Sequence, residues 1–253
     1  MITEFSLAGR TALVTGAGRG IGTGIAEVLA EAGADVAVNA LTGKYLDPFV
    51  KDLAQRSGRK IAGIAGDCTT PAGAAKLLEQ AAAELGPIDI LVNNLGDAIR
   101  KPFEDMTDAE IDKVMGLNIM SAVYCSRAVA ASMIARRRGK IINISSFSGI
   151  SGSANLTIYA VGKSGMVGLT RSLALEWAEH GINVNCIAPG LYPDLAMTGP
   201  ERYAQAEERA KTQVPLKRVG RFREVGLLAL YLASPASDYM TGQIIPLDGG
   251  LTV

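Results

Sequence analysis

The sequence predicts an α/β protein in which a doubly wound parallel sheet of about seven strands carries helices on both faces. Short β-branched segments alternate along the chain with segments whose apolar residues recur every three or four positions, the spacing of a helix face. The short segments are apolar at almost every position, which is typical of parallel strands buried on both sides. Repeated strand–helix units join by right-handed crossovers, and these place helices on both faces of the sheet.

Seven segments have the pattern of a buried strand. The first helix follows the first of them, and its apolar residues over 21–29 are spaced to lie on one face. The predicted strands are 11–15, 34–40, 60–66, 88–94, 140–145, 182–188 and 243–247.

Local signals set the ends of two further helices. Gly86-Pro87 ends one of them, because proline does not continue a helix. Thr107 and Glu110 have the spacing of a capping box, which predicts a helix that begins there and continues through 111–135. No linker, repeat or low-complexity segment divides the chain, so we expect one domain over residues 1–253.

The composition narrows the class of partner. Hydrophobic residues make up 48% of the chain, enough for a large core, and 25 basic residues balance 25 acidic ones. This balance gives no reason to expect a nucleic acid or an anionic membrane as partner. Residues 141–162 carry no charge but are too rich in Ser, Gly and Asn for a membrane span.

The cysteines and the amino terminus indicate a reducing compartment. Cys68, Cys125 and Cys186 are odd in number and show no CxxC spacing, which argues against a disulfide framework or a zinc site. The first 16 residues lack the basic and apolar regions of a secretory signal. We therefore expect a cytoplasmic protein without a bound metal.

A glycine-rich stretch, LVTGAGRGIG, follows the first predicted strand and opens the first helix. Gly16, Gly20 and Gly22 stand where a tight turn, a close phosphate group and a packed helix would each exclude a side chain. The helix behind them presents unpaired N–H groups and a partial positive charge, which favour an anion. The alternative is an ordinary turn without a ligand, but its place in the first strand–helix unit favours a phosphate site.

Further motifs extend over nearly the whole chain. The turn has the pattern TGxxxGIG, residues 93–96 read NNLG, and ISS at 144–146 precedes a YxxxK pair formed by Tyr159 and Lys163. APG at 188–190 and TGQIIPLDGG at 241–250 complete the set. Together these motifs resemble those of the short-chain dehydrogenase/reductase family, in particular its 3-oxoacyl reductase-like branch. The resemblance implies a Rossmann-type fold and reversible hydride transfer between a nicotinamide and a carbonyl or secondary alcohol.

The resemblance also implies which residues hold the dinucleotide. Asp67 is similar to an aspartate that accepts a hydrogen bond from the adenine amino group; the alternative is a turn residue before the next helix. Lys163 would hold the nicotinamide ribose. The implied cofactor-binding residues are Gly16, Arg19, Gly20, Ile21, Gly22, Asn39, Asp67, Asn94, Gly96, Tyr159, Lys163, Pro189, Gly190 and Tyr192.

The end of the second strand indicates which dinucleotide is bound. NAD-binding proteins commonly place an acidic residue there, which accepts from the ribose 2′-OH, but Ala40 and Leu41 occupy that place here. An acid would repel a 2′-phosphate, so its absence permits NADP(H). Arg19 resembles the basic residue that NADP-preferring members use, and Asn39 and Lys44 offer further donors. We favour NADP(H) and keep NAD(H) as the alternative, in which Arg19 is an ordinary loop cation.

Tyr159 and Lys163 share a helix face because they are four residues apart. A free phenol has a pKa of about 10 and is a poor base at neutral pH. An adjacent ammonium and an oxidised nicotinamide would both favour the phenolate, so we expect the pKa of Tyr159 to be lowered. The phenol would then exchange a proton with the substrate oxygen while hydride moves. The alternative is a core tyrosine beside a lysine that reaches the surface.

Two further residues complete the implied catalytic set. Ser146, after the fifth strand, is placed to hydrogen-bond the substrate oxygen and to stabilise developing negative charge. By resemblance, Asn118 in the long helix holds a water that links Lys163 to solvent. The candidate catalytic residues are thus Asn118, Ser146, Tyr159 and Lys163, and their common register argues against a core tyrosine.

Two positions depart from the family pattern. Leu95 replaces the small third residue of NNAG, which predicts either a shifted cofactor or a narrower pocket. Pro193 and Asp194 stand where many members carry a threonine that bonds the nicotinamide carboxamide. The main chain at Leu191 and Tyr192 is the expected substitute.

The segment 191–215 is expected to cover the substrate, since loops beyond the carboxyl ends of strands hold ligands in this architecture. The alternative for each of its residues is an exposed loop or helix position. The candidates, including one basic residue after the fourth strand, are Tyr192, Asp194, Met197, Tyr203 and Arg100.

Our main hypothesis is an NAD(P)(H)-dependent oxidoreductase for a small carbonyl or alcohol substrate, with Tyr159 as general acid and base. The alternatives are an NAD-linked sugar or polyol dehydrogenase, a dehydratase or epimerase with a tightly held cofactor, and a non-enzymatic dinucleotide sensor or scaffold. A sensor has no use for a proton relay. A reductase of carrier-protein substrates needs a basic patch, for which Arg100, Lys101 and 136–138 are available. Members of the family are commonly tetramers, so we expect a homotetramer.

Overall fold

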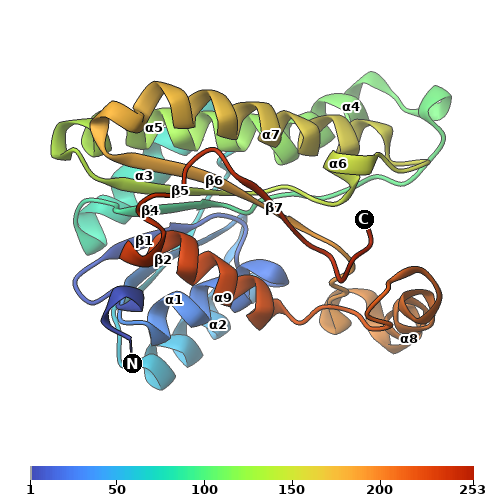
Figure 1. Ribbon diagram of the computed structural model, residues 1–253, viewed down its shortest axis with the longest axis horizontal. Coiled ribbons are helices and arrows are strands. Elements are labelled where there is room, and N and C mark those ends of the chain that lie inside the picture. The colour runs from blue at the N-terminus through green and yellow to red at the C-terminus, as the bar shows by residue number, and fades with distance from the viewer. Residues whose placement is uncertain (1) are drawn as a thin grey trace.

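The computed structural model describes residues 2–253, and a seven-stranded sheet forms its centre (Figure 1). All neighbouring strands are parallel, in the order β3-β2-β1-β4-β5-β6-β7. Each predicted strand is present, and the doubly wound α/β fold is confirmed. The strands are β1 Thr11–Val14, β2 Asp35–Ala40, β3 Ile61–Ala65, β4 Ile90–Asn93, β5 Gly139–Ile144, β6 Ile182–Pro189 and β7 Ile244–Leu247.

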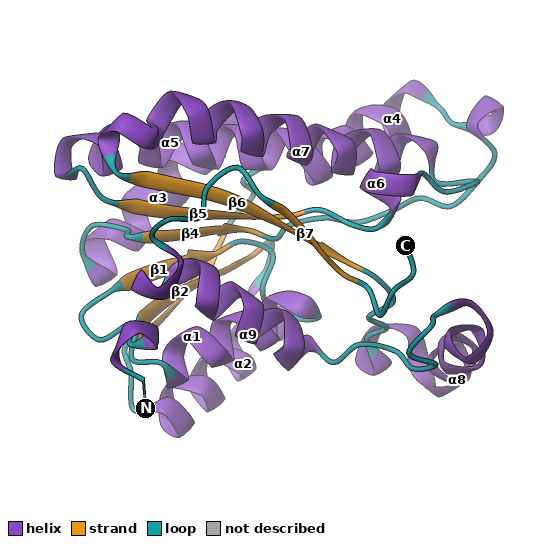
Figure 2. Ribbon diagram, viewed as in Figure 1, coloured by secondary structure: helices purple, strands orange, loops and turns teal. Residues whose placement is uncertain are grey.

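Helices cover both faces of the sheet (Figure 2). They are α1 Ile21–Glu31, α2 Gly43–Ser57, α3 Pro71–Leu85, α4 Asp108–Met115, α5 Ser121–Arg136, α6 Ser148–Ser151, α7 Thr157–Trp177, α8 Leu195–Gln213 and α9 Phe222–Ala233. α1, α2 and α9 pack on one face, and α3, α5 and α7 pack on the other. This is the two-sided covering that the apolar strands predict.

Alternation along the strands divides the core into two halves. Val14 of β1 and Val92 of β4 face the layer of α1 and α9. Leu13 and Leu91, one residue earlier in the same strands, face the layer of α3 and α5. All four side chains are fully buried, because successive residues of a strand point to opposite faces and both faces are covered.

The chain order reverses between β1 and β4. β2 and β3 lie on one side of β1, whereas β4 to β7 lie on the other. Doubly wound sheets bind ligands at such a switch point, beyond the carboxyl ends of the strands. The glycine-rich turn after β1 therefore lies where the architecture opens a crevice.

The predicted long helix is one helical run, Asp108–Arg136, interrupted by a π-helical turn at Gly116–Met120. The predicted capping box is confirmed, because Thr107 and Glu110 each accept a hydrogen bond from the other's backbone N–H. By length and composition the run is apolar enough to cross a membrane, and 44% of its most apolar part is buried inside the molecule. It packs against α3 and α7, as a helix does in a layered α/β core.

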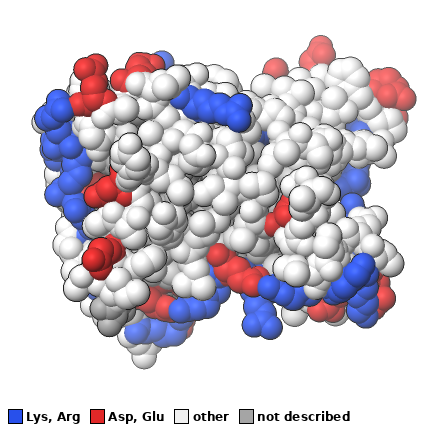
Figure 3. All heavy atoms as spheres, in the orientation of Figure 1, with Lys and Arg blue, Asp and Glu red and all other residues white. Residues whose placement is uncertain are grey.

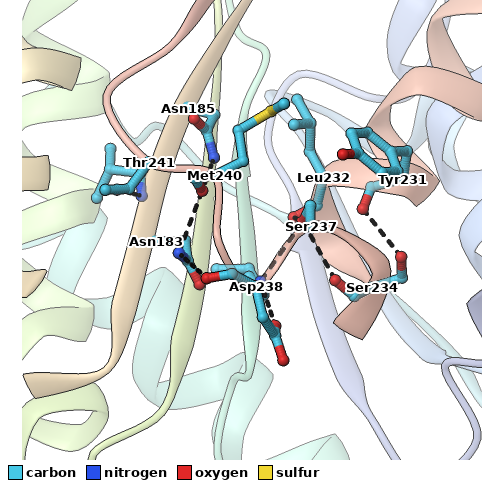
Figure 4. A network of polar contacts seen from close by, with 11 residues as sticks. Asn183, Asn185, Tyr231, Leu232, Ser234, Ser237, Asp238, Met240 and Thr241 are labelled. Carbon is cyan, nitrogen blue, oxygen red and sulfur yellow. Dashed lines mark hydrogen bonds and ion pairs between the residues drawn. The ribbon is translucent and has the colours of Figure 1, made fainter. Parts of the chain in front are cut away.

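Hydrogen bonds hold the turn before β7 against the amino ends of the strands (Figure 4). Asn183 Nδ2 donates to the carbonyls of Asp238 and Met240, both at 3.1 Å. Ser237 Oγ donates to the carbonyl of Leu232 at 3.0 Å, which ties the end of α9 to the same turn. These bonds fix β7 beside β6, at the edge opposite to the crevice.

Candidate active site

A pocket of about 340 Å³ opens beyond the carboxyl ends of β1, β4, β5 and β6. It brings together the glycine-rich turn, the segment after β4, the first turns of α7 and the segment after β6. The pocket collects most of the residues that the motifs predict. Among its lining residues are Gly16, Gly20, Gly96, Tyr159, Lys163 and Tyr192.

The glycine-rich turn packs closely against the segment after β4. Gly16 has a φ of +60°, and a side chain there would place its Cβ 2.8 Å from the Cα of Leu95. Asn94 locks the turn, because its Nδ2 donates to the carbonyls of Thr15 at 2.9 Å and Gly16 at 3.1 Å. α1 begins at Ile21 without a side-chain cap, so its first N–H groups are available to an anion. Asn94 thus shapes the predicted phosphate site and has its amide donors engaged by the turn.

Tyr159 and Lys163 lie one turn apart on α7, with Lys163 Nζ 5.8 Å from the centre of the Tyr159 ring. Lys163 is only 3% exposed, and its Nζ donates to the carbonyl of Ile144 at 2.9 Å. The ammonium is therefore held inside the site at the end of β5. The alternative of a lysine that reaches the surface is wrong.

Burial dominates the ionisation of this pair. The pKa of Lys163 is lowered to about 8 because its ammonium is removed from water. The pKa of Tyr159 is raised, first by burial and further by the carboxylate of Asp97, while a hydrogen bond with Ser146 acts in the opposite direction. The predicted lowering of the Tyr159 pKa by Lys163 is thus wrong for this structure, in which the ammonium bonds to Ile144 and burial penalises the phenolate.

Asn118 is fully buried in the π-helical turn. Its Nδ2 donates to the carbonyls of Asp97 at 2.6 Å and Val114 at 2.8 Å, but its Oδ1 has no hydrogen-bond partner among residues 2–253. A Cβ at Gly96 would lie 2.7 Å from both Asn118 Oδ1 and Lys163 Nζ. Glycine at this position therefore keeps the two polar atoms within reach of one shared partner. An unpaired buried oxygen in a π-helical turn is a feature that functional sites often show.

A second pocket of about 340 Å³ adjoins the contact between Gly16 and Leu95. Leu95 lines this pocket together with Asn39 and Asp67, at the ends of β2 and β3. It does not line the pocket of Tyr159. The departure from the small family residue thus lies on the predicted adenine side of the site, away from the reacting groups.

Two of the predicted cofactor contacts already have partners within the protein. Asn39 is 2% exposed, and its Nδ2 donates to the carbonyls of Ile64 and Gly66, both at 3.1 Å. It therefore ties β2 to the end of β3 and offers no free donor to a 2′-phosphate, which corrects its predicted role. Asp67 Oδ1 accepts from the N–H of Thr69 at 2.8 Å and from its hydroxyl at 2.7 Å. Asp67 thus stabilises the turn before α3 and also lines the second pocket.

Two cations lie near the ring of Tyr45, a residue after the end of β2 that none of the motifs includes. The guanidinium carbon of Arg19 lies 5.7 Å from the centre of the Tyr45 ring, and Lys44 Nζ lies 5.1 Å from the same centre. Tyr45 is 47% exposed, and Arg19 and Lys44 are also exposed, so the ring and both cations face solvent. The only signal in the sequence was that Tyr45 follows Lys44.

The segment after β6 lines the first pocket in part. Tyr192, Asp194 and Met197 line it as predicted, whereas Tyr203 and Arg100 do not. Pro189 ends β6, and the N–H of Gly190 donates to the carbonyl of Leu247 at 3.1 Å. Tyr192 Oη donates to the same carbonyl at 3.0 Å, so its hydroxyl has a partner within the protein.

Asp194 begins α8 beside the glycine-rich turn. Its Oδ1 accepts from the N–H of Ala196 at 3.0 Å, and its Oδ2 lies 3.7 Å from where a Cβ on Gly20 would stand. α8 has non-helical dihedral angles at Gly199, where φ is +75°. The first turn of α8, next to the pocket, is therefore set apart from the remainder of the helix.

No metal centre is evident in the part of the chain that the structure describes. Residues 2–253 contain no group of three or more His, Cys, Asp or Glu side chains that could hold a metal ion. Cys68, Cys125 and Cys186 are buried and free.

Comparison with known proteins identifies the family. A family profile described as enoyl-(acyl carrier protein) reductase matches residues 16–252. The 2-dehydro-3-deoxy-D-gluconate 5-dehydrogenase of Dickeya dadantii (strain 3937) is 39% identical over 255 residues, which cover 99% of this chain and 98% of that one. The 3-oxoacyl-(acyl-carrier-protein) reductase of Vibrio cholerae serotype O1 is 38% identical over 248 residues, which cover 97% of this chain and 98% of that one.

A solved structure gives the same result. The gluconate 5-dehydrogenase of Burkholderia cenocepacia J2315, in complex with NADP and tartrate, has a TM-score of 0.91 and 34% identity, and the match covers 98% of this chain and 97% of that chain. These matches confirm the predicted family, fold and class of enzyme. The chain therefore belongs to the short-chain dehydrogenase/reductase family and is an NAD(P)-dependent oxidoreductase.

Proposed function

We propose that this protein uses NADP(H) to interconvert a small carbonyl compound and a secondary alcohol at the pocket beside Tyr159. The observation that carries the proposal is the meeting of Tyr159 and the buried Lys163 with the cap-free start of α1 in one pocket. A phosphate-binding turn and a proton-exchanging group are the two parts that such an enzyme requires. The residues proposed to act directly are Asn118, Ser146, Tyr159 and Lys163.

The residues present fit a dinucleotide. Two adjoining pockets of about 340 Å³ each flank the Gly16–Leu95 contact, one at the ends of β2 and β3 and the other beside Tyr159. Gly16, Gly20, Ile21 and Gly22 would hold the pyrophosphate, and Asp67 would face the adenine. Lys163, Pro189, Gly190 and Tyr192 would border the nicotinamide half. The bound nicotinamide would supply or accept the hydride.

The protein's own residues would manage the proton and the charge. Tyr159 exchanges a proton between its hydroxyl and the substrate oxygen, and Ser146, which hydrogen-bonds the phenol, stabilises the oxygen as negative charge develops. Lys163 holds positive charge in a site with little water. Asn118 Oδ1 and Lys163 Nζ are both within reach of the space beside Gly96, which suits the proposed water that connects the lysine to solvent.

Arg19 and Lys44 support NADP(H) over NAD(H). Both cations lie near the Tyr45 ring at the end of β2, and Ala40 and Leu41 place no acid there. A 2′-phosphate would meet two positive charges, whereas a 2′-hydroxyl would gain little from them. The NADP found in the Burkholderia cenocepacia structure is in line with this choice.

The cofactor proposal predicts that Arg19→Ala combined with Lys44→Ala weakens NADPH binding by about tenfold to a hundredfold, because two charge-assisted phosphate contacts are lost. NADH affinity should change by less than about threefold. Titration of nicotinamide fluorescence measures both values. Lys76→Ala, which removes an exposed cation from α3, is the matched control and should leave both affinities unchanged. Equal losses for NADPH and NADH, or tighter NADH binding by the wild-type protein, would contradict the assignment.

The basic residues do not favour a carrier-protein substrate delivered to Tyr159. Arg10, Arg137, Arg138 and Lys140 line a cleft of about 740 Å³ at the amino ends of β4, β5 and β6, opposite to the active site. Figure 3 shows Lys and Arg side chains gathered along this edge, at the left of the view. A small free substrate is therefore the better-supported reading of the site.

We further propose that the chain is a single domain and forms a cytoplasmic homotetramer. The family resemblance and the partly exposed apolar run Asp108–Arg136, which has surface to offer a second copy, support the assembly. Segment 191–215 would cover the substrate, with Asp194 and Met197 at the pocket. Sedimentation of the purified protein tests the oligomeric state, and a monomer at micromolar concentration would count against it.

A further inference from the structure

We propose that Asp97 selects substrates that carry a hydrogen-bond donor or a positive charge near the reacting carbonyl, and that it disfavours substrates with a carboxylate there. The inference rests on the proposed function and names the substrate class of the same site. The shared chemistry is an O–H or N⁺–H group that a carboxylate can accept from. A polyhydroxy ketone and an amino ketone both supply it.

Asp97 is exposed and lies on the segment between β4 and α4. It follows Gly96 directly after β4 and lines the same pocket as Tyr159 and Lys163. Its backbone carbonyl accepts from Asn118 Nδ2 at 2.6 Å, and its Oδ1 accepts from the N–H of Ala98 at 2.8 Å. The first bond positions the main chain of Asp97, the second orients its carboxylate, and no hydrogen bond within residues 2–253 involves Oδ2.

The carboxylate of Asp97 has no cation to neutralise it within the described chain. Among residues 2–253, the ion pairs do not include Asp97. Burial is the main cause that raises the pKa of Tyr159, and the nearby carboxylate of Asp97 adds to it in the same direction. A substrate bound at Tyr159 would therefore meet this negative charge.

The other charged residues of the pocket belong to its cofactor side. Arg19 is in the glycine-rich turn, and Lys163 is bonded to the carbonyl of Ile144. Asp194 caps α8 beside Gly20. Among residues 2–253, the basic side chains that line this pocket are Arg19 and Lys163, and neither forms an ion pair with Asp97. The Asp97 carboxylate would therefore attract a donor group on a substrate and repel a carboxylate.

The proposed substrate class differs from the compounds for which two proteins of similar sequence are named. The relative from Dickeya dadantii is named for 2-dehydro-3-deoxy-D-gluconate, and the structure from Burkholderia cenocepacia for gluconate. Both names denote sugar acids with a carboxylate. We infer that this protein acts on a neutral or cationic compound instead.

Three cyclohexanones that differ only in the substituent at carbon 4 test the inference. The substrates are 4-(dimethylamino)cyclohexanone, 4-hydroxycyclohexanone and 4-oxocyclohexanecarboxylate, each reduced with saturating NADPH at neutral pH. We expect kcat/KM to fall in that order, with about tenfold or more between the amine and the carboxylate. In Asp97→Asn, which keeps the shape and removes the charge, this ratio should fall to near one. Equal turnover of amine and carboxylate by the wild-type protein, or an unchanged ratio in Asp97→Asn, would overturn the inference.

Glu104→Gln is the matched control, because Glu104 is an exposed acid on the same segment and does not line the pocket. It should keep the wild-type ratio; loss of the ratio in this variant would show a general charge effect and overturn the role of Asp97. Asp97→Ser is the second charge-removing variant if Asp97→Asn does not fold.

Failure of the proposed function has a different signature. If NADPH binds but none of the three ketones is reduced, the proposed reaction does not occur with such substrates. The role of Asp97 in binding is then tested by the change in the thermal unfolding midpoint of the NADPH complex when each ketone is added. The inference is supported if the amine raises the midpoint of the wild-type complex, the carboxylate does not, and this difference disappears in Asp97→Asn. Equal rises, or none with either ring, overturn it.

Discussion

Tyr159→Phe is expected to lower kcat by about a thousandfold while NADPH binds with nearly wild-type affinity. The substitution removes only the phenolic oxygen, which is proposed to exchange the proton with the substrate, and general acid–base groups contribute about a hundredfold to ten-thousandfold to rates. The ring of Tyr159 stays on α7, so the pocket and the glycine-rich turn keep their shape. Steady-state NADPH oxidation with a ketone substrate and a fluorescence titration of NADPH measure the two quantities.

Tyr239→Phe is the matched control for that experiment. Tyr239 is fully exposed and lines the cleft at the opposite edge of the sheet, so its hydroxyl should not affect turnover. A kcat for Tyr159→Phe within about tenfold of the wild-type value would contradict the role of the phenol. A loss of NADPH binding would instead assign Tyr159 to the cofactor.

The second large effect concerns the buried ammonium of Lys163. Its pKa is lowered from an ordinary 10.5 to about 8, so between these values the unfolded chain binds a proton that the folded chain has released. Stability then rises with pH across this window, on the order of 3 kcal/mol in total, and is lost again as the pH falls through about 8. Lys163→Met has no titrating group at this position and should lack this rise.

Urea unfolding at a series of pH values between 7 and 10 measures the effect as the difference between wild type and Lys163→Met. The free energy of unfolding of the wild type should increase relative to that of Lys163→Met as the pH increases. Lys76→Met, on the exposed face of α3, is the control and should follow the wild-type profile. Parallel curves for wild type and Lys163→Met would show that burial does not perturb this lysine.

Local patterns were sufficient to predict the frame of the site. The seven strands follow from apolar runs, and the capping box of Thr107 and Glu110 follows from their spacing, because both depend on nearby residues alone. The four-residue spacing of Tyr159 and Lys163 also fixes their shared helix face. Such features are set by backbone geometry and survive the folding of the rest of the chain.

Features that depend on long-range contacts could not be read from the sequence. The pKa of Tyr159 is raised mainly by burial and further by the carboxylate of Asp97, and neither cause is visible in a YxxxK motif. Asn39 reads as a free donor until β3 comes beside it and engages its amide. Tyr45 gains significance only when the turn brings Arg19 to its ring.

The same holds for the substrate end of the pocket. Arg100 and Tyr203 have suitable chemistry, but the fold does not place them at the pocket, whereas it does place Asp97 there. The main chain at Asp97 is tied to the π-helical turn through Asn118. A pattern of residue types does not specify such a tertiary bond.

Transfer of an isotope label from the nicotinamide to the product tests hydride transfer at the Tyr159 pocket. NADPH labelled with deuterium at the transferring position of its nicotinamide is incubated with the protein and a ketone, and the alcohol product is analysed by mass spectrometry. We expect one deuterium on the carbinol carbon with the wild-type protein and about a thousandfold less product with Tyr159→Phe. Unlabelled alcohol, no alcohol despite bound NADPH, or equal product from the two proteins would contradict it.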